Sequence, residues 1–286
     1  MKLTVLVDNA TLTDSYYLAE PGLSLHIEDA GLRLLFDAGY SDVFLTNARR
    51  AGIDLLDLDW VALSHGHLDH TWGLDALIRH RVESAHLLCG KERGEKERRE
   101  RPRLLAHPRA FDSRHAGSLP EIGTLLAGDK LSRHFELILS REPVWLSKTL
   151  VWLGEIPRAN DFEHPVPMGR RLSADGETPD TVPDDTALAH VAEDGLTVIT
   201  GCAHAGVCNT VEHARRVTGV DRVRAVIGGF HLLGAPAARL AATADHLAAL
   251  NLEALYPCHC TDLAAKLALA ARCPVREVGS GSVLRR

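Results

Sequence analysis

The sequence predicts an α/β (α+β) sandwich in which mixed β-sheets are covered by helices. Two β-type runs, 23–28 and 32–36, flank the turn Asp29-Ala30-Gly31, which is typical of an antiparallel hairpin. After residue 186, apolar runs of strand length alternate with helical stretches, which indicates strands covered by helices. With 286 residues, 45% of them hydrophobic, the chain is long enough to bury a large core.

The elements can be predicted in order from periodicity and from turn residues. The expected strands are 2–7, 23–28, 32–36, 60–63, 85–89, 103–106, 135–139, 144–146, 150–153, 187–192, 196–200, 224–227 and 254–256. The expected helices are 45–52, 74–80, 210–217, 237–250 and 263–272. No Gly-x-Gly-x-x-Gly follows the first strand, which argues against a doubly wound dinucleotide-binding fold.

We expect one domain over 1–286 with insertions near 91–103 and 119–183. The first insertion carries seven basic and four acidic side chains, which is typical of a solvated segment. The second mixes short β-like runs with proline and glycine and ends in the polar stretch 170–185.

Composition narrows the classes of partner. The net charge of −6 and the pI near 6.2 indicate no basic footprint, so we expect no nucleic acid. No apolar stretch approaches the roughly 20 residues that span a bilayer. The first apolar run is broken by Asp8 and Asn9, and the six cysteines lack a dense spacing, so we expect reduced thiols in a cytoplasmic protein. We expect a small-molecule substrate, and the oligomeric state is left open.

The sharpest chemical signal is His65-Gly66-His67-Leu68-Asp69-His70, which follows an apolar strand. Imidazole nitrogen and carboxylate oxygen bind zinc at about 2.0 to 2.2 Å. Alternation lets His65 and His67 face the same side, whereas Asp69 and His70 are carried round the turn toward a second ion. The alternative is an exposed polar loop. Because the cluster directly follows the apolar strand, we favour a metal site.

This motif, after a hairpin that ends in Leu35-Phe36-Asp37-Ala38-Gly39, resembles the metallo-β-lactamase-fold superfamily. The resemblance extends over most of the chain and implies an αββα sandwich of two mixed sheets with a metal site at one sheet edge. It also implies that His65 and His67 bind a first metal, and that Asp69 and His70 bind a second.

The resemblance implies further ligands in the second half of the chain. The run 256–260 is similar to the family's late strand-Pro-x-His segment, which makes His259 a ligand of the second metal. The central ligands depart from the family pattern, because Cys202 stands where a bridging aspartate is usual and Asp185 stands near a usual histidine position. We expect His204 to supply the missing imidazole, with Asp185 and Cys202 as additional candidates.

Two cysteines, Cys258 and Cys260, flank His259. A Cys-His-Cys run could bind a soft metal, but zinc ribbons need a second cysteine pair at suitable spacing. We therefore expect thiols that lie beside the site rather than bind metal.

Other blocks point to one branch of the superfamily. They are Gly154-Glu155-Ile156-Pro157-Arg158, Asp184-Asp185-Thr186-Ala187-Leu188, Thr200-Gly201-Cys202-Ala203-His204-Ala205-Gly206 and Gly228-Gly229-Phe230-His231-Leu232. Together they resemble dihydropterin ribofuranosylaminobenzene-phosphate synthase-like proteins.

Four residues are candidates for substrate binding. His231 follows two glycines at a strand end, where backbone or ligand can approach closely; the alternative is a structural histidine. His107 ends a strand before a proline and could line the pocket, although a structural role is favoured. Glu155 and Arg158 flank a proline turn and form either an anion-binding corner or a surface ion pair.

The residues predict a metal-dependent hydrolase of a small ester, lactone or phosphate ester. It would use one or two Zn²⁺ ions to make a water reactive, with Mg²⁺ or Mn²⁺ as alternatives. Asp69 would orient that water and carry its proton, and His231 is the second catalytic candidate. One alternative is a metal-dependent transferase acting on a pterin-type diphosphate and an aminobenzene ribosyl phosphate. Another is a non-catalytic ligand sensor.

Overall fold

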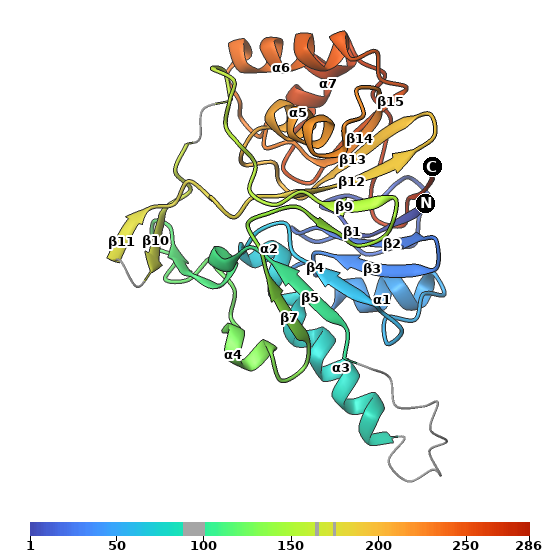
Figure 1. Ribbon diagram of the computed structural model, residues 1–286, viewed down its shortest axis with the longest axis vertical. Helices are drawn as coiled ribbons and strands as arrows, with labels where there is room; N and C mark the ends of the chain where they lie inside the picture. The colour runs from blue at the N-terminus through green and yellow to red at the C-terminus, as the bar shows by residue number, and fades with distance from the viewer. Residues whose placement is uncertain (88–100, 164–165, 174–175) are drawn as a thin grey trace.

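The chain forms a sandwich in which two β-sheets pack face to face and helices cover both outer faces (Figure 1). The computed structural model describes residues 1–87, 101–163, 166–173 and 176–286. One outer layer holds α1 (Val43–Arg50) and α3 (Gly73–Leu87), and the opposite layer holds α5 (Val207–Thr218), α6 (Ala237–Ala249) and α7 (Leu263–Ala270). The short helix α2 (Leu68–Thr71) lies at the edge of the sandwich, where the strands end. The expected αββα architecture is confirmed.

The first sheet has seven strands, and its order places the early hairpin beside three parallel strands. The order is β16 (Val283–Arg285), β1 (Lys2–Val7), β2 (Ser24–Asp29), β3 (Leu32–Phe36), β4 (Trp60–Ala62), β5 (Arg103–Ala106) and β7 (Glu136–Leu139). The hairpin β2–β3 turns at Ala30 and Gly31, which both have positive φ, as a tight two-residue turn requires. From β3 to β7 the strands run parallel.

The second sheet has six strands, and helices connect its parallel half. The order is β15 (Ala254–Cys258), β14 (Val223–Gly229), β13 (Gly195–Thr200), β12 (Ala187–Ala192), β9 (Leu150–Trp152) and β8 (Val144–Trp145). Helix α5 joins β13 to β14 and α6 joins β14 to β15, and these three strands are parallel. Their carboxyl ends therefore meet at one edge of the sandwich.

The interface between the sheets is apolar and fully packed. Side chains such as Phe36, Ile199 and Ile227 are completely buried there. Trp152 is also fully buried, and its indole Nε1 donates to the carbonyl of Leu63 at 3.1 Å. This bond joins β9 of the second sheet to the end of β4, immediately before the histidine cluster.

A third, smaller sheet lies beside the sandwich. It pairs β11 (Gly176–Pro179) with β10 (Arg170–Ser173) and β10 with β6 (Ser113–His115), and the β10–β11 hairpin projects from the body in Figure 1. The segment 119–183, which was expected as an insertion, thus supplies this hairpin and also β7, β8 and β9 of the main sheets. The short elements η2 (Pro108–Phe111) and α4 (Gly128–Leu131) complete this region.

One predicted strand is wrong. Residues 85–87, the start of the strand expected at 85–89, continue helix α3, and residues 88 and 89 lie outside the described residues. A short apolar run does not distinguish a strand from a helix by periodicity alone. Of the insertion expected near 91–103, residues 91–100 also lie outside the described part, and Arg103 begins β5.

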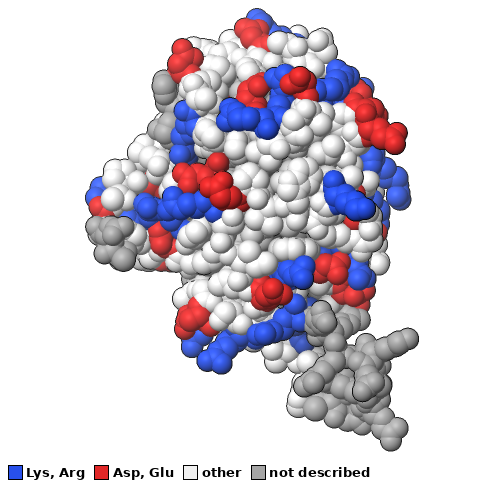
Figure 2. Space-filling model, in the orientation of Figure 1, with Lys and Arg blue, Asp and Glu red and all other residues white. Residues whose placement is uncertain are grey.

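The surface carries no extended patch of one sign on the face in Figure 2, where acidic and basic side chains are interspersed. Within the described ranges, no helix combines the length and the apolar character needed to cross a membrane.

A buried glutamate fastens helix α5 to the loop that precedes β10. The Glu163 carboxylate accepts from the backbone N–H groups of Cys208 and Asn209, both at 2.9 Å. Asn160 donates to the same carboxylate at 2.6 Å. The first amides of a helix have no partner within it and carry partial positive charge, so a buried anion satisfies both needs. This contact fixes the start of α5 at Val207, three residues after His204.

We predict that Glu163→Ala lowers the free energy of unfolding by about 2 to 3 kcal/mol, because buried helix amides lose a charged acceptor. Urea unfolding measures the change. The exposed Glu193 is the matched control, and its alanine variant should stay within about 0.5 kcal/mol of the parent. Equal stabilities for the two variants would contradict the role of Glu163.

Candidate metal centre

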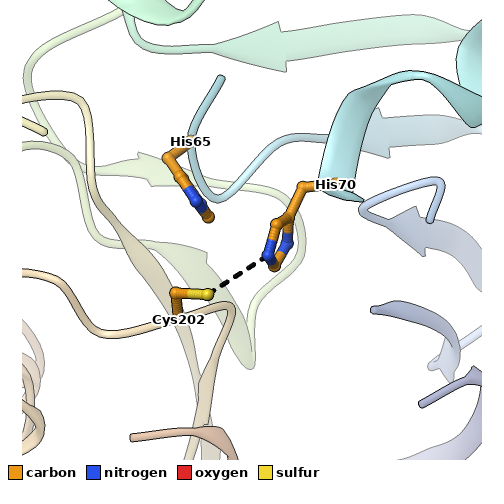
Figure 3. Close-up of side chains that lie close together, drawn as sticks. All are labelled: His65, His70 and Cys202. Carbon is orange, nitrogen blue, oxygen red and sulfur yellow. Dashed lines mark hydrogen bonds between the residues drawn. The ribbon is translucent and has the colours of Figure 1, made fainter. Parts of the chain in front are cut away.

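Strand ends from both sheets converge on one cluster of histidines, cysteines and carboxylates. In the first sheet, β3 is followed by Asp37 and β4 by the segment 64–70. In the second sheet, the parallel strands β13, β14 and β15 are followed by the segments 202–204, 231 and 259–260. Figure 3 shows His65 and His70 approaching Cys202 from the opposite sheet. The architecture thus brings together side chains that lie far apart in the sequence.

The first donor group consists of His65, His67 and His204. The Nε2 atom of His65 lies 3.1 Å from Nδ1 of His67 and 3.2 Å from Nε2 of His204. A tetrahedral zinc ion with nitrogens at about 2.0 to 2.1 Å sets neighbouring nitrogens about 3.3 Å apart. The three buried rings therefore fit one ion.

The second donor group consists of Asp69, His70 and His259. Nε2 of His259 lies 3.1 Å from Nε2 of His70 and 3.2 Å from Oδ2 of Asp69. Cys202 adjoins this group, because its Sγ is 3.3 Å from Nε2 of His70 (Figure 3). These separations also fit ligands of one small cation, with nitrogen, oxygen and sulfur donors at hand.

Hydrogen bonds to Nδ1 of His65 and of His70 orient these two rings so that Nε2 faces the other donors. Asp37 Oδ2 accepts from Nδ1 of His70 at 2.7 Å and from the Ser64 hydroxyl at 2.6 Å. The Ser64 oxygen in turn accepts from Nδ1 of His65 at 2.9 Å. With Nδ1 engaged in this way, Nε2 is the nitrogen of each ring that is left to face the cluster.

His259 is held in the same way from the N-terminal strand. Its Nδ1 donates to Oδ1 of Asn9 at 2.8 Å, and its backbone N–H donates to Asp8 at 2.7 Å. This leaves Nε2 as the nitrogen that faces Asp69 and His70.

A buried ion cluster supports the loop that carries His65 and His67. The fully buried Arg114 donates to Asp184 at 2.7 Å, and the same carboxylate accepts from the Gly66 backbone N–H at 2.8 Å. Nη1 of Arg114 also lies 3.4 Å from Asp180. Nε2 of His67 points to this Asp180 carboxylate at 3.5 Å, which leaves Nδ1 for the donor group.

The electrostatics of the cluster keep the first group neutral. Burial lowers the pKa of His65 and of His204 well below the ordinary value, and it also lowers the pKa of His67. Neutral imidazoles are the form that binds metals.

In the second group, burial opposes the charged forms, but mutual attraction outweighs it. The Asp69 and Asp37 carboxylates raise the pKa of His70 to about 9. The His70 charge and a hydrogen bond from His259 hold the pKa of the Asp69 carboxyl well below its usual range.

The donor groups border a cavity of about 780 Å³. Its polar side includes His67, Asp69, His204, His231 and His259. The remaining lining is largely apolar and contains Pro21, Tyr40, Leu68, Ala116, Leu119, Ile122, Met168 and Leu233. A small molecule in this cavity would touch both the donor groups and an apolar wall.

The other predicted residues divide into those near the cluster and those elsewhere. His231 lines the cavity, and its ring centroid lies 4.3 Å from that of His204. Asp185 is buried and belongs to no donor group found among the described residues; its Oδ2 accepts from the Ala205 N–H at 2.8 Å. Burial raises the pKa of Asp185 to about 7.

Three residues expected to bind substrate are not among those that line the cavity in the described ranges. His107 accepts from the Arg109 N–H through Nδ1, and Nε2 lies 3.3 Å from Glu155, so its polar atoms are engaged in the fold. Arg158 donates to the carbonyls of Thr181 and Val182. These contacts tie loops together, and the anion-binding role expected for Glu155 and Arg158 stays a prediction.

Four residues that orient the rings were not predicted from the sequence: Asn9, Asp37, Ser64 and Asp180. Asp37 lies at the end of the hairpin run 35–39, and no role was predicted for it. Its signal was an acid directly after a buried strand, the same pattern that marked His65. Nothing in the local pattern distinguished Asn9 and Asp180, since only tertiary structure brings them to a histidine.

A family model described as the metallo-beta-lactamase superfamily matches residues 19–259. A protein of Methanocaldococcus jannaschii named 7,8-dihydropterin-6-methyl-4-(beta-D-ribofuranosyl)-aminobenzene-5'-phosphate synthase is 31% identical over 284 residues. That match covers 93% of this chain and 89% of the relative.

Two solved structures extend the comparison. Tm1679, described as a metal-dependent hydrolase of the beta-lactamase superfamily, is similar with a TM-score of 0.80 and 26% identity, covering 100% of this chain and 99% of its own. Zinc-bound PqqB from Methylobacterium extorquens has a TM-score of 0.56 at 15% identity, covers 100% of both chains and shows the fold alone.

We predict that Asp37→Asn weakens binding of a second metal equivalent by about 10- to 100-fold. The amide would present N–H to Nδ1 of His70, which favours the tautomer whose Nε2 carries the proton. Metal content after dialysis against a graded chelator measures the effect. Asp29→Asn is the control, because Asp29 is also a buried carboxylate but binds Ser147 and Thr149 away from the cavity. Retention of both equivalents in Asp37→Asn would contradict the assignment.

Proposed function

Because this chain belongs to the metallo-beta-lactamase superfamily, in the branch of the dihydropterin ribofuranosylaminobenzene-phosphate synthase homologues, we propose that it is a metal-dependent hydrolase of a small ester, lactone or phosphate ester. The observation that carries this proposal is the pair of donor groups at the border of one cavity. The resemblance to Tm1679, described as a metal-dependent hydrolase, supports it.

We propose His65, His67 and His204 as ligands of a first ion and Asp69, His70 and His259 as ligands of a second, with Cys202 beside the second. Imidazole, carboxylate and thiol donors suit zinc, and Mg²⁺ or Mn²⁺ suit the set less well because they prefer oxygen. When bound, such ions supply Lewis acidity and lower the pKa of water.

Asp69 and His231 are the proposed proton carriers. The Asp69 carboxylate lines the cavity, and its side chain is 27% exposed, so an attacking water can reach it. It would orient that water and accept its proton. Nδ1 of His231 is buried without a hydrogen-bond partner in the described structure, and the ring lines the same cavity. His231 would contact the substrate and protonate the leaving group.

The cavity lining favours a neutral or singly charged substrate. Among the residues that line the cavity in the described part of the chain, none is lysine or arginine. The fully buried Arg114 is already paired with Asp180 and Asp184. An apolar wall stabilises an acyl or aryl group, whereas a substrate with several phosphates would find no arginine fork. This supports an ester or lactone ahead of a diphosphate.

The second candidate is a metal-dependent transferase that acts on a pterin-type diphosphate and an aminobenzene ribosyl phosphate. The name of the relative with 31% identity favours it. Activity that requires an amine acceptor would identify the transferase. A non-catalytic sensor would bind metal without turnover. The cytoplasmic location and the absence of a nucleic-acid partner stay predictions.

We predict that His67→Ala removes metal and activity together, because the buried ring supplies a donor to the first group. His231→Gln should keep the metal content of the parent and lose about 100-fold or more in kcat. Metal analysis of protein purified without chelator, followed by steady-state kinetics, separates the two effects. We expect two zinc equivalents in the parent.

Two results would contradict this assignment. Unchanged metal content in His67→Ala would remove His67 from the ligands. Loss of metal in His231→Gln would make His231 a ligand rather than a proton carrier.

We predict a larger rate enhancement over the uncatalysed reaction for para-nitrophenyl butyrate or an aliphatic lactone than for para-nitrophenyl phosphate. The physical reason is the apolar wall of the cavity, together with a described lining that contains neither lysine nor arginine. Leu119, a half-exposed residue of the cavity wall, allows a converse test. Leu119→Lys should raise kcat/KM for the phosphate relative to the butyrate, and Leu119→Gln should not. A parent that prefers the phosphate dianion would contradict the substrate class while leaving the hydrolase proposal intact.

A further inference from the structure

A second, sulfur-rich donor set occupies the wall of the cavity that belongs to the second sheet. The thiol sulfurs of Cys202 and Cys260 and a ring nitrogen of His259 all lie within 4.8 Å of one another. Cys202 follows β13, whereas the other two follow β15, so only the fold brings the pair of cysteines together. Both cysteines line the cavity.

Backbone groups hold the Cys260 thiol, and a histidine ring contacts the Cys202 thiol. Cys260 Sγ accepts the backbone N–H of His231 at 3.1 Å and lies 3.4 Å from the carbonyl of Cys202. Sγ of Cys202 lies 3.3 Å from Nε2 of His70. A dashed line marks this contact in Figure 3. The sulfurs therefore face the same space as the nitrogen and oxygen ligands proposed above. Cys258, in contrast, is completely buried in the core between the sheets.

His259 is common to both donor sets. Its Nδ1 is engaged by Asn9, so Nε2 is the nitrogen available to an ion. The same Nε2 faces Asp69 at 3.2 Å. One lone pair binds one ion, so His259 cannot serve an ion of each set at the same time.

We propose that Cys202, His259 and Cys260 form a binding site for a thiophilic metal ion such as Cd²⁺, which competes with the ion held by Asp69, His70 and His259. Thiolate is a soft ligand and imidazole is intermediate, whereas the competing set includes a hard carboxylate and no thiolate. The hardness of the ion thus decides which set binds, and a soft ion displaces the second hydrolytic ion.

The test is titration of metal-free protein with Cd²⁺, followed by the ultraviolet charge-transfer absorption that cadmium–thiolate bonds produce. The double variant Cys202→Ser/Cys260→Ser measures the absorption that cadmium bound to the other cysteines produces. Above that background, Cys202→Ser and Cys260→Ser should each lose about half of the band, since each removes one of two sulfur–metal bonds. Asp69→Asn should keep the full band.

The controls separate this site from the hydrolytic centre. Cys273→Ser removes a thiol buried under α6, remote from the cavity, and should leave the cavity band unchanged. Zinc added before cadmium should raise the cadmium concentration needed for half of the band in the parent, but not in Asp69→Asn. Thermal unfolding of each serine variant verifies that it is folded.

Two outcomes would overturn the proposal. A full band in Cys260→Ser would show that this thiol does not bind cadmium. Loss of the band in Asp69→Asn would show that the thiols only complete the centre already described. Neither outcome depends on catalytic turnover, so a failure of the hydrolase proposal would be seen separately, in the kinetics.

Discussion

The buried carboxylate of Asp37 is the contact on which the geometry of the centre depends. It stands at the end of β3 and accepts hydrogen bonds from His70 and from both polar groups of Ser64. Ser64 in turn hydrogen-bonds to Nδ1 of His65. The one Asp37 carboxylate therefore orients His70 directly and His65 through Ser64, which is one ring in each proposed donor group. Close packing reinforces this, since a Cβ at Gly201 would clash with Ser64 Oγ. The second sheet can therefore approach Asp37 only through a glycine.

The strand ends at the centre share an uncommon backbone conformation. Asp37, Ala203, His231 and His259 all have φ between 51° and 58°, in the left-handed region that costs a non-glycine residue roughly 1 to 2 kcal/mol. Two of these turns are held by bonds from the backbone amide, that of His259 to Asp8 and that of His231 to Cys260. The left-handed residue turns the chain sharply at the strand end and directs the side chain across the sheet edge. The strained backbone at these strand ends lowers the stability of the fold, and in return it positions side chains of the proposed centre.

Most of the architecture could be predicted from the sequence because its signals are local. The β2–β3 hairpin follows from a turn of two residues, and the β/α alternation after residue 186 follows from periodicity. The cluster 65–70 could be found because its donors are contiguous. Asn9, Asp37 and Asp180 escaped because each acts on a histidine that another strand supplies. The sequence left two roles open for His107 and Arg158, because a polar residue beside a proline looks the same whether it binds a ligand or a group of the fold; neither lines the cavity in the described ranges.

The proposed ligands come from both sheets and from distant parts of the chain. His70 and His259 are separated by 189 positions yet lie in contact across the interface. An ion bound between them would link the two sheets. Its binding site would be complete only after the C-terminal strands had packed against the rest of the fold. Any ligand that binds the folded state alone raises its stability by mass action. The melting temperature of this protein would therefore rise with the amount of that ion bound.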